Sequence, residues 1–195
     1  MVRLALCLVA ALWATPAVSQ VEQGTDPSGG SFFHQVNFRN FKSSDQERVL
    51  QALDAIAEVV QSEKFRQAVL GFKNNRGKQE FLENNGLSNA QIYELLLEGA
   101  ERLRPVPDRT LDLDITWYYK NNRTVGYTYK SSNRIWVNSK FYRRYSVPQM
   151  SRNLFHEWTH KMGFGHVRYS NRPWTVPYGL GKKMEALVAE HLRDQ

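Results

Sequence analysis

The segment from Ser146 to His166 reads SVPQMSRNLFHEWTHKMGFGH, and its pattern indicates how the C-terminal part of the chain folds. Ser146 and Gln149 have the spacing of a capping box, and a helix tolerates Pro148 in its first turn. Gly163 is expected to end this helix, because glycine accepts the left-handed conformation that reverses the chain. The segment therefore predicts a helix followed by a sharp return of the chain.

Three of the five histidines of the chain lie in this segment. His156 and His160 are four residues apart, so their imidazoles share one helix face and can reach one ion. His166 follows the chain reversal and is the third candidate metal ligand. Glu157 can hold a water bound to that ion. The full pattern would arise by chance about 10⁻⁵ times in a chain of this composition, which favours a metal site over scattered surface histidines.

The run from His156 to His166 matches HExxHxxGxxH and resembles the signature of the metzincin zinc metallopeptidases. The stretches 127–129, 135–138 and 176–179 are similar to those of small exported bacterial proteins with this motif. The resemblance implies an α+β, metzincin-like fold, in which a twisted, antiparallel-rich sheet packs on the active-site helix. It also implies Zn²⁺ as the cofactor.

The chemistry of the candidate ligands agrees with a hydrolytic site. Three neutral imidazoles leave Zn²⁺ an open position for water, and the ion lowers the pKa of that water. Glu157 is then the general base that takes the proton of the water and passes it to the leaving amine. We therefore expect a secreted zinc-dependent endopeptidase. The alternatives are a non-catalytic zinc-containing binding protein of the cell envelope and a zinc amidase acting on peptidoglycan peptides.

Metzincins place a methionine in a tight turn beneath the metal, and some add a tyrosine near the ion. Pro177, Gly179 and Gly181 predict a turn downstream of the motif. Within it, Tyr178 is either a donor to the oxyanion of the reaction or a packed aromatic residue. Met184 is either the turn methionine or a core residue of a C-terminal helix.

Residues 111–117, 125–129 and 135–141 alternate between apolar and polar side chains, which predicts strands. Short polar turns separate them, so we expect an antiparallel meander. The stretch from Arg134 to Phe141 is the candidate edge strand, along which a polypeptide substrate would bind in extended form.

Helical spacing of apolar residues predicts several helices before these strands. Ser44 with Glu47 is expected to cap a helix over 45–61, and Ser88 with Gln91 a later one.

The chain divides into three expected regions. Residues 1–19 form a signal peptide, residues 20–42 a linker and anchor segment, and residues 43–195 a single metallopeptidase-like domain. Within this domain, residues 43–110 are helical, and residues 111–195 hold the sheet, the active-site helix and the C-terminal helix.

The N-terminal segment has the three-part layout of a secretory signal peptide. Its apolar run, from Leu4 to Trp13, is too short to span a bilayer, and no later segment is long enough to form a transmembrane anchor. Cleavage after Ser19 or Ala17 would remove Cys7, the only cysteine, so no thiol chemistry is expected. The protein is expected to be exported, either secreted or periplasmic.

The composition is that of a globular protein, with 42% hydrophobic and 23% charged residues. The formal net charge is +7. The longest basic runs are only Arg143-Arg144 and Lys182-Lys183, so nucleic acid is not an expected partner. His34 and His191 lie outside the motif and are expected to be surface residues.

Overall fold

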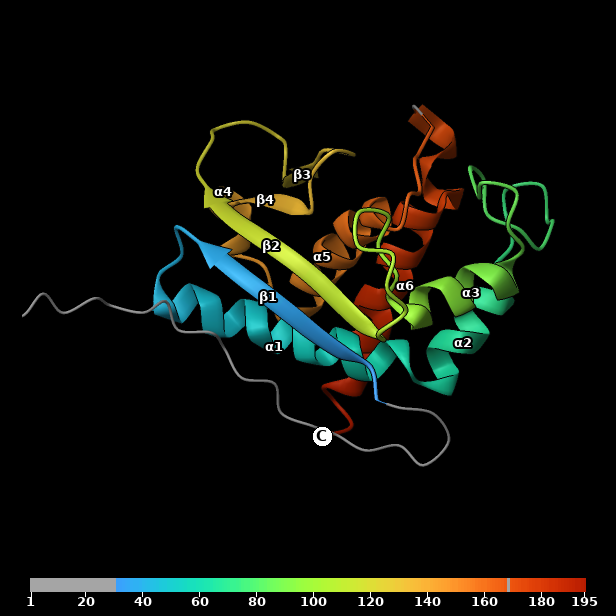
Figure 1. Ribbon diagram of the computed structural model, residues 1–195, viewed down its shortest axis with the longest axis horizontal. Helices are drawn as coiled ribbons and strands as arrows, with labels where there is room; N and C mark the ends of the chain where they lie inside the picture. The colour runs from blue at the N-terminus through green and yellow to red at the C-terminus, as the bar shows by residue number, and fades with distance from the viewer. Residues whose placement is uncertain (1–30, 168) are drawn as a thin grey trace, which may run out of the picture.

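A four-stranded mixed sheet with helices packed against it forms the framework of the protein (Figure 1). The computed structural model describes residues 31–167 and 169–195, so the expected signal peptide and residues 20–30 lie outside the described residues. In chain order the elements are β1 (Phe33–Arg39), α1 (Ser43–Val60), α2 (Glu63–Leu70), α3 (Asn89–Glu98), β2 (Thr110–Tyr118), β3 (Gly126–Thr128), β4 (Arg134–Asn138), α4 (Ser139–Tyr142), α5 (Val147–Lys161), the 3₁₀ helix η1 (Tyr169–Trp174) and α6 (Val176–His191). The fold class is therefore α+β.

The strands lie in the order β1-β2-β4-β3. β1 pairs with β2 in parallel, and β2 pairs with β4 in parallel. Among the strands of the described residues, only β3 and β4 form an antiparallel pair. The expected antiparallel-rich meander is therefore wrong, because β4 pairs with β2 as well as with its hairpin neighbour β3.

The edge strand differs from the one expected. β4 lies between β2 and β3, so the stretch from Arg134 to Phe141 is not an edge, and Phe141 itself belongs to α4. The turn at 129–133 folds β3 back against the outer side of β4, which closes that side of β4. The short strand Gly126–Thr128 is consequently the edge of the sheet on this side.

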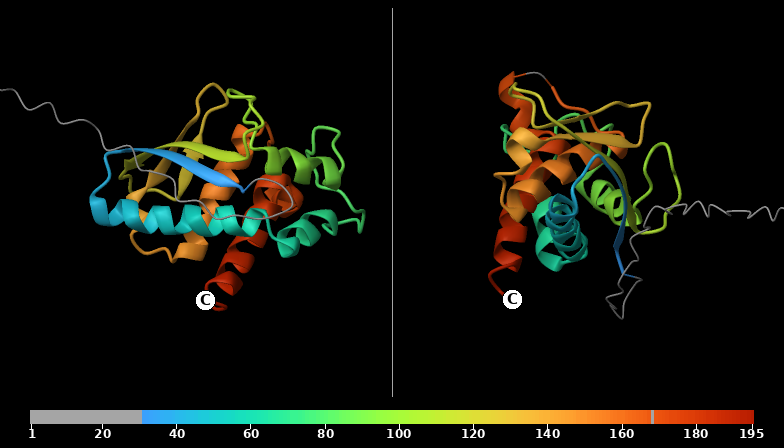
Figure 2. Two further views of the ribbon diagram at one scale, coloured as in Figure 1. Left: turned by 60° about the horizontal axis from the view of Figure 1, so that its bottom comes forward. Right: turned by 90° about the vertical axis from the view of Figure 1, so that its left-hand side faces the viewer.

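The segment expected to be a linker supplies the other edge strand. Val36 and Phe38 of β1 pack against the core, whereas Asn37 between them is exposed. This alternation is that of a strand with one buried face. β1 also packs on α1, and in Figure 2 α1 runs beneath it.

Two of the three expected capping boxes are present. Ser88 with Gln91 and Ser146 with Gln149 form the reciprocal hydrogen bonds at the starts of α3 and α5. α1 instead begins at Ser43, with Lys42 at the cap and no side-chain cap, so the box expected at Ser44 and Glu47 is wrong. In the described part of the chain, no helix is both long and apolar enough to span a membrane.

The turn expected at Pro177, Gly179 and Gly181 is also wrong, because all three residues lie in the first turns of α6. Pro177 fits the first turn of a helix. A Cβ on Gly181 would lie 3.1 Å from the backbone oxygen of Arg152 and 3.5 Å from the Cβ of His156. The glycine therefore allows α6 to approach α5 closely. Met184 follows on the same helix, fully buried, and is a core residue.

Candidate metal centre

The three histidines of the motif come together in space. His156 and His160 lie on α5, with ring centroids 4.9 Å apart. The His166 ring lies 5.8 Å from that of His156 and 5.1 Å from that of His160. One ligand nitrogen from each residue can be chosen so that all three lie within 4.8 Å of one another.

His166 reaches the other two histidines because the chain reverses after α5. Gly163 has a φ of 97°, the left-handed region expected from the sequence. The amide of Phe164 donates to the oxygen of Thr159 over 3.1 Å, and the amide of Gly163 donates to that of His160 over 3.2 Å. These two bonds form a Schellman motif, which satisfies carbonyls at the helix end and fixes the direction of the exit.

The protonation state of the three histidines suits metal coordination, because a neutral imidazole has a free lone pair. Burial, and after it the neighbouring His160 and His166 rings, lower the pKa of His156 from 6.5 to about 3. Burial also lowers the pKa of His160 and of His166. Nδ1 of His160 lies 2.7 Å from the oxygen of Phe164. Because a carbonyl only accepts, Nδ1 carries the proton and the lone pair of Nε2 is left for a ligand.

Glu157 is 4% exposed and lies beside these rings, on the wall of a cleft. Burial raises the pKa of its carboxyl to about 7, while Lys161 and a hydrogen bond from Asn153 act in the opposite direction. The hydroxyl of Tyr142 donates to Oδ1 of Asn153 over 2.8 Å. That bond leaves the amide nitrogen of Asn153 facing the carboxylate of Glu157.

Tyr178 lies at the start of α6, against the histidine cluster. Its ring centroid is 4.6 Å from that of His156 and 5.2 Å from that of His166. The close approach of α6 to α5 brings the tyrosine here. Tyr178 is half-buried and lines the same cleft as Glu157.

The cleft in front of the histidines has a volume of about 650 Å³. The edge strand β3 forms one wall, since Gly126, Tyr127 and Thr128 all line it. A Cβ on Gly126 would lie 2.7 Å from Oδ1 of Asn153 and 3.3 Å from Oε1 of Glu157. The backbone of the edge strand thus passes directly over the carboxylate.

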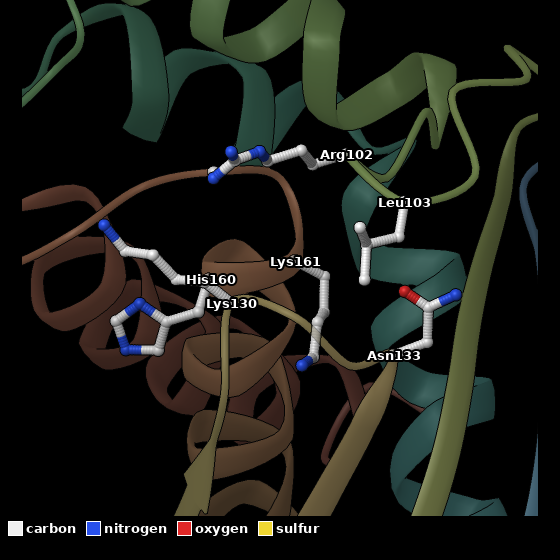
Figure 3. Close-up of a pocket in the computed structure, with 7 residues that line it drawn as sticks. Arg102, Leu103, Lys130, Asn133, His160 and Lys161 are labelled. Atoms are coloured by element: carbon white, nitrogen blue, oxygen red, sulfur yellow. The ribbon is translucent and has the colours of Figure 1, made fainter.

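Lys161 fixes the edge strand to the end of α5. Its buried ammonium donates to Oγ1 of Thr128 and to the backbone oxygens of Tyr129 and Ser132. Burial lowers the pKa of Lys161 to about 8. In Figure 3 the Lys161 side chain and the His160 ring leave α5 in different directions. Lys161 thus holds the hairpin of β3 and β4, and the neighbouring His160 faces the other two histidines.

The donor set fits Zn²⁺. Three nitrogen ligands from a helix and the loop after it leave a coordination position open, as in catalytic zinc sites. The hydrogen bond on Nδ1 of His160 is the kind of outer contact that orients a zinc-binding imidazole. The open side faces the cleft, because His156, His160 and His166 all line it.

The remaining two histidines lie elsewhere, as expected. His34 pairs with Asp54 over 2.7 Å, and His191 pairs with Glu58 over 2.8 Å.

Sequence reasoning missed the partners of Glu157. Asn153 lies four residues before Glu157 on the same helix face, so its spacing could have indicated the contact. Tyr142 lies in a different helix, and only the packing of α4 near α5 brings it to Asn153.

No model of a known protein family matches the chain, and the search of curated proteins finds no match either. The geometry and chemistry of the site are therefore the basis for assigning a function.

Proposed function

We propose that the protein is an exported zinc-dependent endopeptidase of the metzincin type. The observation that carries this proposal is the group of three histidine nitrogens within 4.8 Å of one another, with the buried carboxylate of Glu157 beside it on one cleft. A purely structural metal would need neither a buried carboxylate at the site nor an open side toward a cleft.

His156, His160 and His166 would hold the ion. When bound, Zn²⁺ would polarise the scissile carbonyl and lower the pKa of the attacking water. Glu157 accepts the proton of that water and delivers it to the leaving amide nitrogen. Asn153 orients the carboxylate through its amide. The hydroxyl of Tyr178 donates to the oxygen that gains negative charge.

The substrate would be a polypeptide bound in extended form along β3. An edge strand presents unpaired backbone groups with which another chain can form a ladder. β3 replaces the stretch Arg134–Phe141 in this role. Because Gly126 carries no side chain, the edge strand itself can lie close to Glu157, and a substrate paired with that strand would be brought to the site.

The metzincin assignment is supported by the motif and by an antiparallel edge strand beside the helix that carries it. Met184 is the only methionine after His166, and it lies inside α6. The proposal therefore does not include a methionine turn beneath the metal.

The decisive experiment compares the purified protein with its Glu157→Gln variant. We expect both to hold about one zinc per chain by metal analysis. Only the wild type should cleave an unfolded protein, and a chelator should abolish that cleavage. Equal cleavage by the variant would refute the role of Glu157. Zinc binding without any cleavage would favour an envelope binding protein, and cleavage restricted to peptidoglycan peptides would favour an amidase.

A further inference from the structure

Arginines dominate the charge of the cleft. Arg123, Arg152 and Arg172 line it, whereas Glu157 and Glu185 are the only acidic residues among the described residues that line it. Arg152 is paired with Glu185, with 3.0 Å between Nη1 and Oε2. Among the described residues, Arg123 and Arg172 have no acidic partner. Two cationic groups in the wall of the cleft are therefore available to a ligand.

Arg172 lies close to the histidine cluster. Its guanidinium carbon is 5.8 Å from the centroid of the Tyr178 ring, which itself contacts the rings of His156 and His166. The Nε atom of Arg172 is buried and finds no hydrogen-bond partner within 31–167 and 169–195. A buried donor without a partner is costly, and a ligand that accepts its hydrogen bond removes that cost.

Arg123 lines the same cleft. It is exposed and precedes β3 by two residues, Thr124 and Val125. A chain that pairs with β3 would pass this guanidinium at the end of the edge strand. Arg172, beside the histidine cluster, and Arg123, before the edge strand, thus both line the cleft in which the proposed substrate would lie.

The chemistry of these two groups selects one class of ligand. A guanidinium presents a planar set of N–H donors that matches the two oxygens of a carboxylate. Apart from Glu157, Glu185 is the only acidic residue that the described lining of the cleft offers to a substrate cation, and it already pairs with Arg152. An acidic group is therefore attracted, and a basic one is repelled.

We propose that the cleft selects polypeptides that carry a carboxylate next to the scissile bond, held by Arg172 and Arg123. This inference rests on the proposed endopeptidase function and specifies its substrate class. The carboxylate can belong to an aspartate or glutamate side chain, or to the C-terminus of the substrate. Both sources present the same two oxygens to a guanidinium.

A binding measurement separates this selectivity from catalysis. Zinc-loaded Glu157→Gln protein is titrated with fluorescent peptides that differ only in Glu against Gln at single positions, each with a free or an amidated C-terminus. We expect about 3- to 10-fold tighter binding of the acidic peptides, decreasing with added salt. If only the change from Glu to Gln alters the affinity, the recognised carboxylate is that of the side chain. If only amidation alters the affinity, the recognised carboxylate is that of the C-terminus. Equal affinity for all peptides would overturn the proposal.

Three variants test the residues. Arg172→Gln and Arg123→Gln should each reduce the preference for the acidic peptide, whereas Arg193→Gln, an exposed residue outside the cleft, should keep it. Because all three remove one positive charge, an equal loss in Arg193→Gln would refute a local effect. Arg123→Glu, in an exposed loop, should shift the preference toward a lysine peptide. An unchanged preference in that variant would also count against the proposal.

The two proposals fail in different ways. If the wild type shows no zinc-dependent cleavage but the acidic peptide still binds more tightly, the peptidase function is wrong and the carboxylate site stands. If cleavage depends on zinc and Glu157 but is equal for the Glu and Gln peptides at every position and for both C-termini, only the carboxylate site is wrong.

Discussion

The hydroxyl of Tyr142 donates a 2.8 Å hydrogen bond to Oδ1 of Asn153. Because an amide accepts through its oxygen and donates through its nitrogen, this bond determines which end of Asn153 faces Glu157. The Tyr142 side chain is fully buried, so the orientation is held by packing as well. The carboxylate that we propose as the general base is thus oriented by a residue of another helix.

Loss of the Asn153 amide should impair catalysis without loss of the metal. We expect Asn153→Ala to lower kcat about 10-fold or more, because a misplaced base transfers protons poorly. A hydrogen bond to the charged form lowers a carboxyl pKa, so its removal should move the acidic limb of the pH–rate profile to higher pH. Unchanged zinc content with an unchanged pH profile would contradict this role. Tyr142→Phe, which keeps the amide, should show a smaller loss.

A side chain at Gly126 should disturb the same group. A Cβ there would lie 2.7 Å from Oδ1 of Asn153 and 3.2 Å from the backbone oxygen of Trp136. Something must shift, and the amide is the more mobile partner. We predict that Gly126→Ala lowers kcat/KM severalfold with a small loss of stability. Gly165→Ala is the matched control, because no described residue has an atom within 4 Å of its added Cβ. Equal activity of Gly126→Ala and wild type would show that the edge strand is not closely packed against Asn153 at this position.

Zinc should stabilise the protein against heat, since it binds the folded arrangement of the three histidines. At a free zinc concentration of 100 Kd the gain is about 2.7 kcal/mol, which corresponds to a rise in Tm of about 5–10 °C for a chain of this size. The measurement is calorimetry with and without zinc. His166→Ala should largely remove the rise and His191→Ala should retain it, because His191 pairs with Glu58 away from the site. A full rise in His166→Ala would exclude that residue as a ligand.

The local features of the site could be predicted from the sequence. The i, i+4 spacing of His156 and His160, the capping box at Ser146 and the left-handed Gly163 each depend on neighbours within one or two helical turns. Such local features can therefore be predicted without knowing how the rest of the chain folds.

The predictions that proved wrong concern features that depend on contacts between residues far apart in the sequence. β1 pairs with β2 although a long stretch of chain separates them; Phe33, for example, lies opposite Thr110. Parallel strands are not joined by a short turn, so no turn motif in the sequence indicates which strand is the neighbour. The sequence pattern wrongly assigns Gly181 to a turn, because glycine occurs both in turns and where two backbones approach closely. Only the position of α5 in the folded structure shows that Gly181 serves the close approach of two helices and not a turn.

Glu101 should make the stability of the fold depend on pH. Its carboxyl is 2% exposed, and Oε1 accepts hydrogen bonds from Nε1 of Trp158 over 2.6 Å and from the amide of Asp112 over 3.0 Å. It therefore joins α5 to β2. Burial raises its pKa from 4.5 to about 7. Folding thus favours the protonated form, and the stability that this form contributes is present in full below about pH 4.5 and is lost as the pH rises through about 7.

The Glu101→Gln variant tests this dependence, because glutamine keeps an oxygen acceptor for both donors but cannot ionise. Relative to wild type, its free energy of unfolding should increase between pH 4.5 and pH 8 by about 1–3 kcal/mol. Denaturant unfolding of both proteins over this range gives the difference, in which the titration of all other groups largely cancels. Glu98→Gln, which removes an exposed carboxyl at the end of α3, is the control for the loss of one negative charge. A flat difference for Glu101→Gln would mean that Glu101 ionises in the folded protein without cost.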